Sequence, residues 1–229
     1  MAAIQQIVTA AGGPTQRILD YGCGDLYTGR MLLDRLNAES LVGVDTGLTP
    51  ELCVRYREGD PRIELHAHTA PLQGRCFELV LLCDVIEHVA DDREVIAAVR
   101  DYLTPNGRIV VTVPAFQALF SERDRALKHF RRYTLAGLQE RLKAAGLVPL
   151  AGGYLFGSLL LIRAVQKLWE WLRGGAGSGE HGIGAWRGGR ALTALIVLHF
   201  KLEHAVLFAL ARLGVKLPGL TAWAICKRS

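Results

Sequence analysis

A short apolar run that ends in an acid and two glycines carries the clearest chemistry in this sequence. Residues 18–24 read Ile-Leu-Asp-Tyr-Gly-Cys-Gly. Glycine suits a backbone that must adopt torsions closed to other residues or approach a ligand closely, and a helix that begins just after such a turn offers unpaired amides. The run therefore predicts a strand, a tight turn and a helix that together bind a nucleotide-like ligand.

A second acid stands at a suitable distance for ribose binding. Residues 41–45 form another apolar run, Leu-Val-Gly-Val-Asp, and its Asp45 follows Asp20 by 25 residues. In nucleotide-binding folds an acid at about this separation accepts a hydrogen bond from a ribose hydroxyl. We therefore expect Asp45, with Thr46 beside it, to bind a ribose.

Further apolar runs indicate the scaffold that positions these residues. Residues 77–84 and 107–114 are two such runs, and a predicted turn at residues 103–107 precedes the second. Strands that alternate with helices form a parallel sheet, whose ligands bind at the carboxyl ends of the strands. The predicted fold class is α/β.

This series resembles the class I S-adenosylmethionine-dependent methyltransferases from residue 17 to about residue 150. The resemblance implies a Rossmann-like seven-stranded sheet with strand order 3-2-1-4-5-7-6 and S-adenosylmethionine as the cofactor. The third glycine of a dinucleotide-binding turn is missing, because Leu26 and Tyr27 stand in its place. This favours a methyl donor, which has no pyrophosphate for such a glycine to accommodate.

The resemblance also implies residues that bind the donor. Asp20 and the two glycines would border its methionine portion, and Asp45 would hold its ribose. The acid that often contacts the adenine amino group is replaced here by a His-Ala-His segment, so His68 is either an acceptor for that hydrogen bond or a surface histidine. The expected donor-binding residues are Asp20, Tyr21, Gly22, Cys23, Gly24, Asp45, Thr46, His68, Cys83 and Asp84.

Two histidines are candidates for catalysis. Transfer to a hydroxyl requires a proton to leave as the methyl arrives, and a neutral histidine is the usual acceptor. Residues 113–134 resemble a methyltransferase subgroup that carries Val-Pro-Ala, Ser-x-x-Asp and His-x-Arg-Arg-Tyr segments and occurs in polysaccharide and glycolipid gene neighbourhoods. Arg131 and Arg132 would match a phosphate or carboxylate on the acceptor, or would only lead into the next helix. The expected catalytic residues are His88, His129, Arg132 and Tyr133.

A metal site is a further hypothesis. The Asp-x-x-Glu-His at residues 84–88 is similar to the Glu-x-x-Glu-His of quinone-pathway O-methyltransferases and small-RNA ribose methyltransferases, which hold a divalent cation. The implied ligands are Asp84, Glu87, His88 and His129. Mixed oxygen and imidazole ligands permit Mg, Mn or Zn.

Charge and hydropathy separate the two parts of the chain. Of the 229 residues, half are hydrophobic; residues 1–150 carry 17 Lys and Arg against 19 Asp and Glu, whereas residues 151–229 carry 10 against 3. A basic and apolar segment suits the surface of an anionic membrane. We expect no nucleic-acid partner, because the positive charge accompanies apolar runs rather than a polar groove.

The predicted organisation is a donor-binding core at residues 1–154, a helical insertion at residues 155–214 between the last two strands, and a final strand within residues 215–229. The insertion comprises two predicted helices, residues 155–172 and 190–213, joined by a glycine-rich and flexible stretch. Neither helix has the roughly 18 uncharged apolar residues of a membrane span. The insertion is therefore an in-plane membrane anchor, a lid over the acceptor, or extra core and a homodimer face.

The predicted function is S-adenosylmethionine-dependent O-methylation of a lipid-linked, glycolipid or other amphiphilic acceptor at a membrane surface. One alternative is a soluble small-molecule methyltransferase, and another is a degenerate donor-binding scaffold for a glycosyltransferase. Residues 1–8 do not resemble a signal peptide, and the five cysteines show no paired metal spacing. We therefore expect a cytoplasmic protein, peripheral on the inner face of the membrane.

Overall fold

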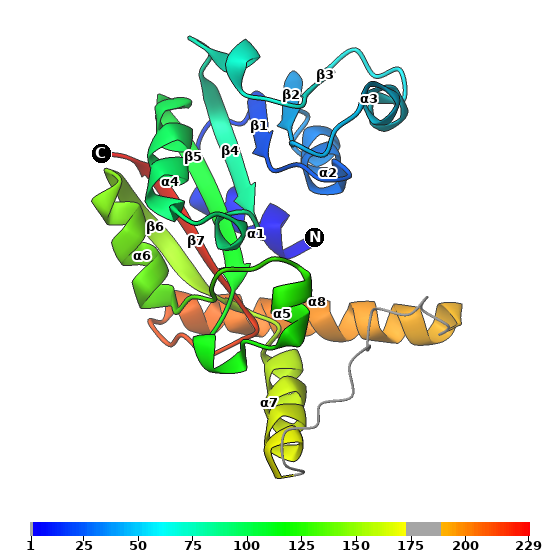
Figure 1. Ribbon diagram of the computed structural model, residues 1–229, viewed down its shortest axis with the longest axis vertical. Helices are drawn as coiled ribbons and strands as arrows, with labels where there is room; N and C mark the ends of the chain where they lie inside the picture. The colour runs from blue at the N-terminus through cyan, green and yellow to red at the C-terminus, as the bar shows by residue number, and fades with distance from the viewer. Residues whose placement is uncertain (1, 173–188) are drawn as a thin grey trace.

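The computed structural model describes residues 2–172 and 189–229, and in these ranges seven strands form one sheet (Figure 1). The strand order is β3-β2-β1-β4-β5-β7-β6, with β7 antiparallel to both of its neighbours. The α/β class and this order confirm the sequence prediction. The strands are β1 (Arg17–Tyr21), β2 (Ser40–Val44), β3 (Ile63–His66), β4 (Phe77–Cys83), β5 (Leu103–Pro114), β6 (Leu147–Leu155) and β7 (Thr221–Arg228).

Helices cover both faces of this sheet. One hydrophobic core contains side chains of α4 and α6, which lie on the same side of the sheet in Figure 1, and a second core contains side chains of α1 and α2. The helices of the core are α1 (Ala2–Ala11), α2 (Tyr27–Arg35), α3 (Pro50–Arg57), α4 (Asp92–Asp101), α5 (Glu122–Ala126) and α6 (Leu135–Ala144), with 3-10 turns η1 (Ala70–Leu72), η2 (Ile86–His88) and η3 (Gln117–Leu119).

Burial on both faces explains the continuous apolar runs in the sequence. In β4, Val80 and Leu82 belong to one core, while Leu79 and Leu81 belong to the other. A central parallel strand cannot alternate apolar and polar residues, because both of its faces are covered. Because β1, β2 and β4 are parallel, the turns that follow them lie at one edge of the sheet.

The start of β5 differs from the prediction of a turn at residues 103–107. Leu103 already pairs with Phe77, and the register then shifts so that the next regular pair joins Leu79 to Arg108. The Pro-Asn-Gly sequence therefore forms an irregularity within the strand rather than a turn before it, because tertiary pairing of the buried Leu103 extends the strand.

Two long helices lie between β6 and β7 in the chain, as the sequence predicted. They are α7 (Gly157–Leu172) and α8 (Arg190–Arg212). Figure 1 shows α7 projecting away from the sheet and the first half of α8 extending beyond it. The glycine-rich stretch that we predicted to be flexible lies outside the described residues, apart from its end.

The apolar character of α8 exceeds the prediction from sequence. Among the described helices, α8 is the one that is long and apolar enough to cross a membrane, judged by length and composition alone. An 18-residue window within Arg190–Ala211 has a mean hydropathy of 1.7, and 11% of that window is buried. Lys201 and Glu203 interrupt the apolar residues of this helix, and for this reason the sequence predicted no membrane span.

Contacts within the insertion hold the two helices to each other and to the sheet. Glu203 of α8 accepts hydrogen bonds from the amide and the hydroxyl of Ser158, at the first turn of α7. Further along α8, the ring of Phe208 lies 5.3 Å from that of Trp223 on β7. The second half of α8 is thus fixed against the protein.

A buried carboxylate connects α4 to the segment before α6. Asp92 is 1% exposed, and it accepts hydrogen bonds from Arg141 (2.6 Å) and from the hydroxyl of Tyr133 (2.8 Å). The guanidinium of Arg131 lies 3.1 Å from it. Asp92 therefore neutralises cationic groups from two parts of the chain.

We expect Asp92→Ala to lower the free energy of unfolding by about 3 kcal/mol, because the change removes the carboxylate that two partly buried guanidinium groups and a buried phenol share. Urea denaturation followed by circular dichroism measures the loss. The matched control is Asp91→Ala, which removes the exposed N-cap of α4 and should cost about 1 kcal/mol. Equal losses in the two variants would contradict the central role of Asp92.

Candidate active site

The glycine turn after β1 is held against the end of β2. The amides of Gly22 and Cys23 both donate to the carbonyl oxygen of Val44, at 2.7 and 3.1 Å. Gly22 has a φ of 76°, and a Cβ atom at this position would overlap the side chain of Val85. Both the torsion and the close approach require glycine here.

Two acids lie beside this turn. Asp20 is 3% exposed and accepts a hydrogen bond from the amide of Gly29 in α2 (3.1 Å); its burial raises its pKa to about 7. Asp45 is partly exposed and accepts hydrogen bonds from the amides of Gly24 (3.0 Å) and Gly47 (2.8 Å). A carboxylate has about four lone-pair sites, so Asp45 retains acceptor capacity for hydroxyl groups.

The other predicted donor-binding residues surround the same edge. Tyr21 and Cys83 end β1 and β4 and are partly buried, Cys23 is buried, and Thr46 and His68 are exposed after β2 and β3. Asp84 follows β4 with a φ of 55°, a left-handed torsion that is uncommon outside glycine. The structure thus gathers most of the set at the ends of the central strands.

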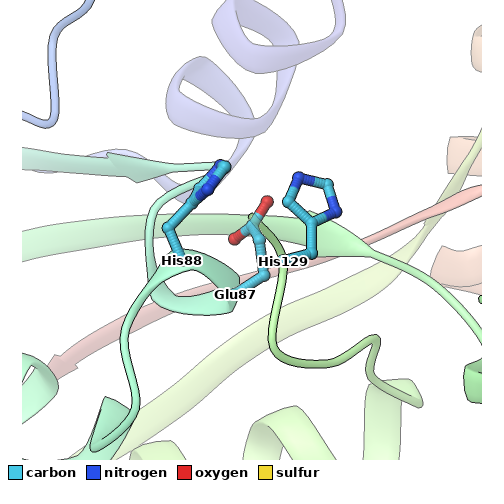
Figure 2. Close-up of side chains that lie close together, drawn as sticks. All are labelled: Glu87, His88 and His129. Atoms are coloured by element: carbon cyan, nitrogen blue, oxygen red, sulfur yellow. The ribbon is translucent and has the colours of Figure 1, made fainter. Parts of the chain in front are cut away.

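Three side chains converge on the acceptor side. Glu87 and His88 belong to η2, and His129 follows α5, yet their ligand atoms all lie within 4.8 Å of one another (Figure 2). The rings of the two histidines meet edge to face, with centroids 4.6 Å apart. The amide of Phe130 donates to the carbonyl oxygen of Glu87 (2.7 Å), which fixes the loop that carries His129 against η2.

Asp124 holds His129 in place. This carboxylate is 1% exposed and lies 3.0 Å from Nδ1 of His129, while Nε of Arg132 (2.8 Å) and the amide of Ser121 (2.9 Å) donate to it. Burial alone would raise the pKa of Asp124, but the hydrogen bonds from Arg132 and His129 hold it below its usual range. The ionised carboxylate favours a proton on Nδ1, which leaves the Nε2 lone pair of His129 available.

The Ser-x-x-Asp segment of the sequence includes Asp124, but no role at the site was predicted for this residue. Ser121 and Asp124 form a capping box at the start of α5, in which each side chain binds the backbone of the other residue. The Ser-x-x-Asp spacing is typical of a helix start. That spacing predicts the hydrogen bonds to Ser121 but gives no indication that Asp124 also binds His129.

Glu87 has the opposite environment. Glu87 is 1% exposed, and its Oε2 has no hydrogen-bond partner among the residues that the structure describes. Burial, assisted by the nearby Asp84, raises the pKa of Glu87 to about 8. Partial burial and the neighbouring His129 lower the pKa of His88, which favours a neutral imidazole.

Three polar residues with predicted roles at the acceptor have internal partners. The guanidinium of Arg132 binds Asp124 and the carbonyl oxygen of Ala115, and that of Arg131 binds Asp92 and the carbonyl oxygen of Ala90. The hydroxyl of Tyr133 donates to Ile86 and Asp92, and its ring is buried. These contacts position η2 and α5, and direct catalytic roles for Arg132 and Tyr133 stay predictions.

Comparisons with known proteins agree with this arrangement. A model of the methyltransferase domain matches residues 2–151. A probable S-adenosylmethionine-dependent methyltransferase of Mycolicibacterium smegmatis is 30% identical over 134 residues, which are 56% of this chain and 51% of that protein. An uncharacterized methyltransferase of Mycobacterium tuberculosis is 27% identical over 131 residues, which are 56% of this chain and 64% of that protein. The chain thus spans about half to two thirds of the length of these relatives.

Solved structures share the fold. A putative sarcosine dimethylglycine methyltransferase from Galdieria sulphuraria superposes with a TM-score of 0.59 at 15% identity, covering 100% of this chain and 83% of that chain. The 1,6-didemethyltoxoflavin-N1-methyltransferase of Burkholderia thailandensis, solved with S-adenosylhomocysteine, has a TM-score of 0.54 at 22% identity and covers 66% and 68% of the two chains. Since the domain model covers more than half of the sequence, this chain belongs to the methyltransferase domain family, in agreement with its resemblance to the class I S-adenosylmethionine-dependent methyltransferases.

Proposed function

We propose that this enzyme methylates an oxygen of a lipid-linked or otherwise amphiphilic acceptor at a membrane surface. The observation that carries the proposal is the exposed apolar surface of the two inserted helices. Large apolar surfaces of this kind normally have a partner. Its exposed residues include Leu161, Ile162, Val165, Leu168, Leu172, Leu192, Leu195, Val197, Leu198, Leu202 and Val206.

The charge of the insertion favours a lipid partner over a protein partner. Residues 155–214 carry 7 Lys and Arg against 3 Asp and Glu, and each cation near anionic headgroups contributes about 1 kcal/mol of attraction. On α8, Leu195, Leu198, Leu202 and Val206 recur at intervals of three and four residues, which places them on one helix face. The proposed membrane contact is therefore a stripe of apolar side chains within a basic region that faces the lipid headgroups.

An in-plane orientation suits α8 better than a span. The contacts of Glu203 with Ser158 and of Phe208 with Trp223 attach one side of the helix to the rest of the protein. A helix that is fixed along its side against a folded domain presents its opposite side to lipid. We infer that residues 155–214 form a peripheral anchor on the cytoplasmic face of the membrane.

The anchor is connected to the acceptor side. Nζ of Lys167 on α7 donates to the carbonyl oxygen of Phe120 (3.0 Å), between η3 and α5. An acceptor held by lipid would thus lie close to the segment that carries Asp124 and His129. The imidazoles of His88 and His129 suit oxygen as the methylated atom, since transfer to a hydroxyl requires help with its proton.

A soluble acceptor is the second candidate. The hydrogen bond from Lys167 to Phe120 would equally allow α7 to act as a lid over a small molecule. The insertion would then contact the acceptor or a second copy of the chain instead of lipid. Vesicle binding separates this candidate from the first.

We expect the protein to bind vesicles that contain anionic phospholipid, and Leu202→Glu to weaken this binding at least tenfold. The change removes a side chain that is 60% exposed from the proposed contact and brings a carboxylate towards the headgroups. Co-sedimentation measures the bound fraction. The matched control is Val54→Glu on α3, where the wild-type side chain is 75% exposed and binding should be unchanged. Failure of the wild-type protein to bind such vesicles would favour the soluble candidate, and a dimer that Leu202→Glu dissociates would identify a homodimer face.

Asp45 provides a test of donor binding. We expect Asp45→Ala to weaken S-adenosylmethionine binding at least tenfold in calorimetry, because the change removes the proposed ribose acceptor and the partner of the Gly24 amide. The control is Asp25→Ala, an exposed acid in the same turn. If the wild-type protein binds neither S-adenosylmethionine nor S-adenosylhomocysteine, the scaffold alternative gains support.

Asp20 should make donor binding depend on pH. The donor is a sulfonium cation, so it prefers the ionised form of Asp20, whose pKa is about 7. Affinity should rise about five- to tenfold between pH 6 and pH 7.5 in the wild-type protein and stay constant in Asp20→Asn. The same slope in both proteins would assign the titration to another group.

Asp20 should also lower the free energy of unfolding at alkaline pH. A carboxyl whose pKa is raised from 3.8 to about 7 stabilises the fold fully below about pH 4, and this contribution is lost as the pH rises through 7. The loss is on the order of 4 kcal/mol. Asp20→Asn should therefore unfold at a higher urea concentration than the wild-type protein at pH 8, even though it binds the donor more weakly.

A further inference from the structure

We propose that Glu87, His88 and His129 bind a divalent first-row transition-metal cation that holds the acceptor oxygen opposite the donor methyl group. Binding of the cation is independent of the proposed function, whereas its part in methyl transfer rests on that function. Three observations carry the proposal. The ligand atoms of the three side chains converge, Oε2 of Glu87 has no hydrogen-bond partner among the described residues, and Asp124 holds the imidazole of His129 in place.

The three side chains have the composition and approximate spacing of a metal site. Their ligand atoms lie within 4.8 Å of one another, and Figure 2 shows all three side chains directed toward a common region. Ligands at about 2.1 Å from a tetrahedral ion lie roughly 3.4 Å apart, so a shift of about 1 Å would complete the site. His88 is the exposed member of the group and has room for such a shift.

The unsatisfied oxygen of Glu87 points independently to a ligand. This side chain is almost fully buried, yet Oε2 has no hydrogen-bond partner among the described residues. A buried carboxylate without a partner is costly, and native proteins satisfy nearly all such atoms. A cation between Glu87 and the two imidazoles would supply the missing partner.

His129 is oriented as a metal ligand normally is. Its Nδ1 lies 3.0 Å from Oδ1 of Asp124, and the other ring nitrogen lies on the side of Glu87 in Figure 2. Imidazoles that bind metals almost always donate their second N–H to a carboxylate or a carbonyl group, which fixes the ring and its tautomer. Asp124 is itself held by Arg132 and Ser121, so the support is rigid.

The composition of the site selects the type of cation. Two imidazoles and one carboxylate suit Zn²⁺, Mn²⁺, Fe²⁺ or Co²⁺, whereas Mg²⁺ prefers oxygen ligands. Asp84, which the sequence had suggested as a fourth ligand, is outside the group that converges. Three protein ligands leave coordination positions open for acceptor oxygens and water.

With both imidazoles bound to it, the cation, rather than a histidine base, would activate the acceptor, as a Lewis acid. A hydroxyl bound to it loses its proton to water more readily. The oxygen then forms a bond to the methyl carbon, and the carbon–sulfur bond breaks with its electron pair moving to sulfur. The products are the methylated acceptor, neutral S-adenosylhomocysteine and one proton, which balances the positive charge of the donor.

Calorimetric titration of the chelator-treated protein with ZnCl2 and with MnCl2 tests the site. We expect one ion per chain, with Zn²⁺ bound more tightly than Mn²⁺. Glu87→Gln and His129→Gln should each weaken binding more than tenfold, and Asp124→Asn should weaken it 10- to 100-fold. The matched controls are Glu94→Gln on α4 and His199→Gln on α8, which change exposed residues of the same types and should retain wild-type affinity.

Two outcomes would overturn the proposal. One is a wild-type protein that binds neither Zn²⁺ nor Mn²⁺, and the other is equal affinity in the wild-type protein and the Glu87 and His129 variants. Circular dichroism confirms that each variant is folded. Vesicle binding and calorimetry with S-adenosylmethionine on the same preparations report on the proposed function, so a failure of the metal site and a failure of that function are distinguishable.

Discussion

The buried carboxylate of Asp124 is the interaction on which the proposed acceptor side of this protein depends. It binds a guanidinium, an imidazole and an amide of the segment between β5 and α6, which contains the 3-10 turn η3 and the short helix α5 that carries Asp124. The adjacent Arg131 binds a different buried carboxylate, Asp92, so consecutive side chains tie this segment to two separate points. Buried ion pairs recover the cost of desolvation only when every partner is in place, and removing one partner is strongly destabilising. These charged contacts therefore act together with the short helix α5 to hold the segment in one conformation.

The buried carboxylates of this structure fall into two groups. Those with arginine partners support loops, and those without lie at the proposed site. Asp92 and Asp124 each receive arginine side chains and support loops. Asp20 and Glu87 are as deeply buried but form no ion pair among the described residues, and burial raises their pKa values to about 7 and about 8. Such groups reduce stability at neutral pH, and perturbed carboxyl groups of this kind cluster at functional sites. Asp20 lies on the proposed donor side and Glu87 on the proposed acceptor side. A bound cationic group at each place would offset the stability that these buried carboxyl groups cost.

The sequence predicted the features for which burial dictates the residue type. It did not predict the features that depend on which side chains become hydrogen-bond partners in the fold. The apolar runs predicted β1, β2 and β4 because strands covered on both faces must be apolar throughout. The Gly-x-Gly turn was predictable for a related reason, since a side chain at Gly22 would overlap Val85. By contrast, a guanidinium fork fits an internal carboxylate as well as a phosphate on a substrate, so the partners of Arg131 and Arg132 could not be read from their types. His88 and His129 are 41 residues apart, and only the fold brings their rings into contact.

The register of the sheet brings both ends of the insertion between β6 and β7 to the proposed acceptor side. Thr221, at the start of β7, pairs with Leu155 at the end of β6 and with Pro114 at the end of β5. The amide of Ala115, where the acceptor segment begins, donates to the carbonyl oxygen of Leu220 (2.8 Å). Both connections of the insertion therefore lie at the edge of the sheet where β5 opens toward Asp124 and His129. An insertion at the opposite ends of these strands would lie a strand length away, about 20 Å or more for strands of this size. A membrane bound by α7 and α8 would thus present its lipids at the acceptor edge, which is the geometry that an amphiphilic substrate requires.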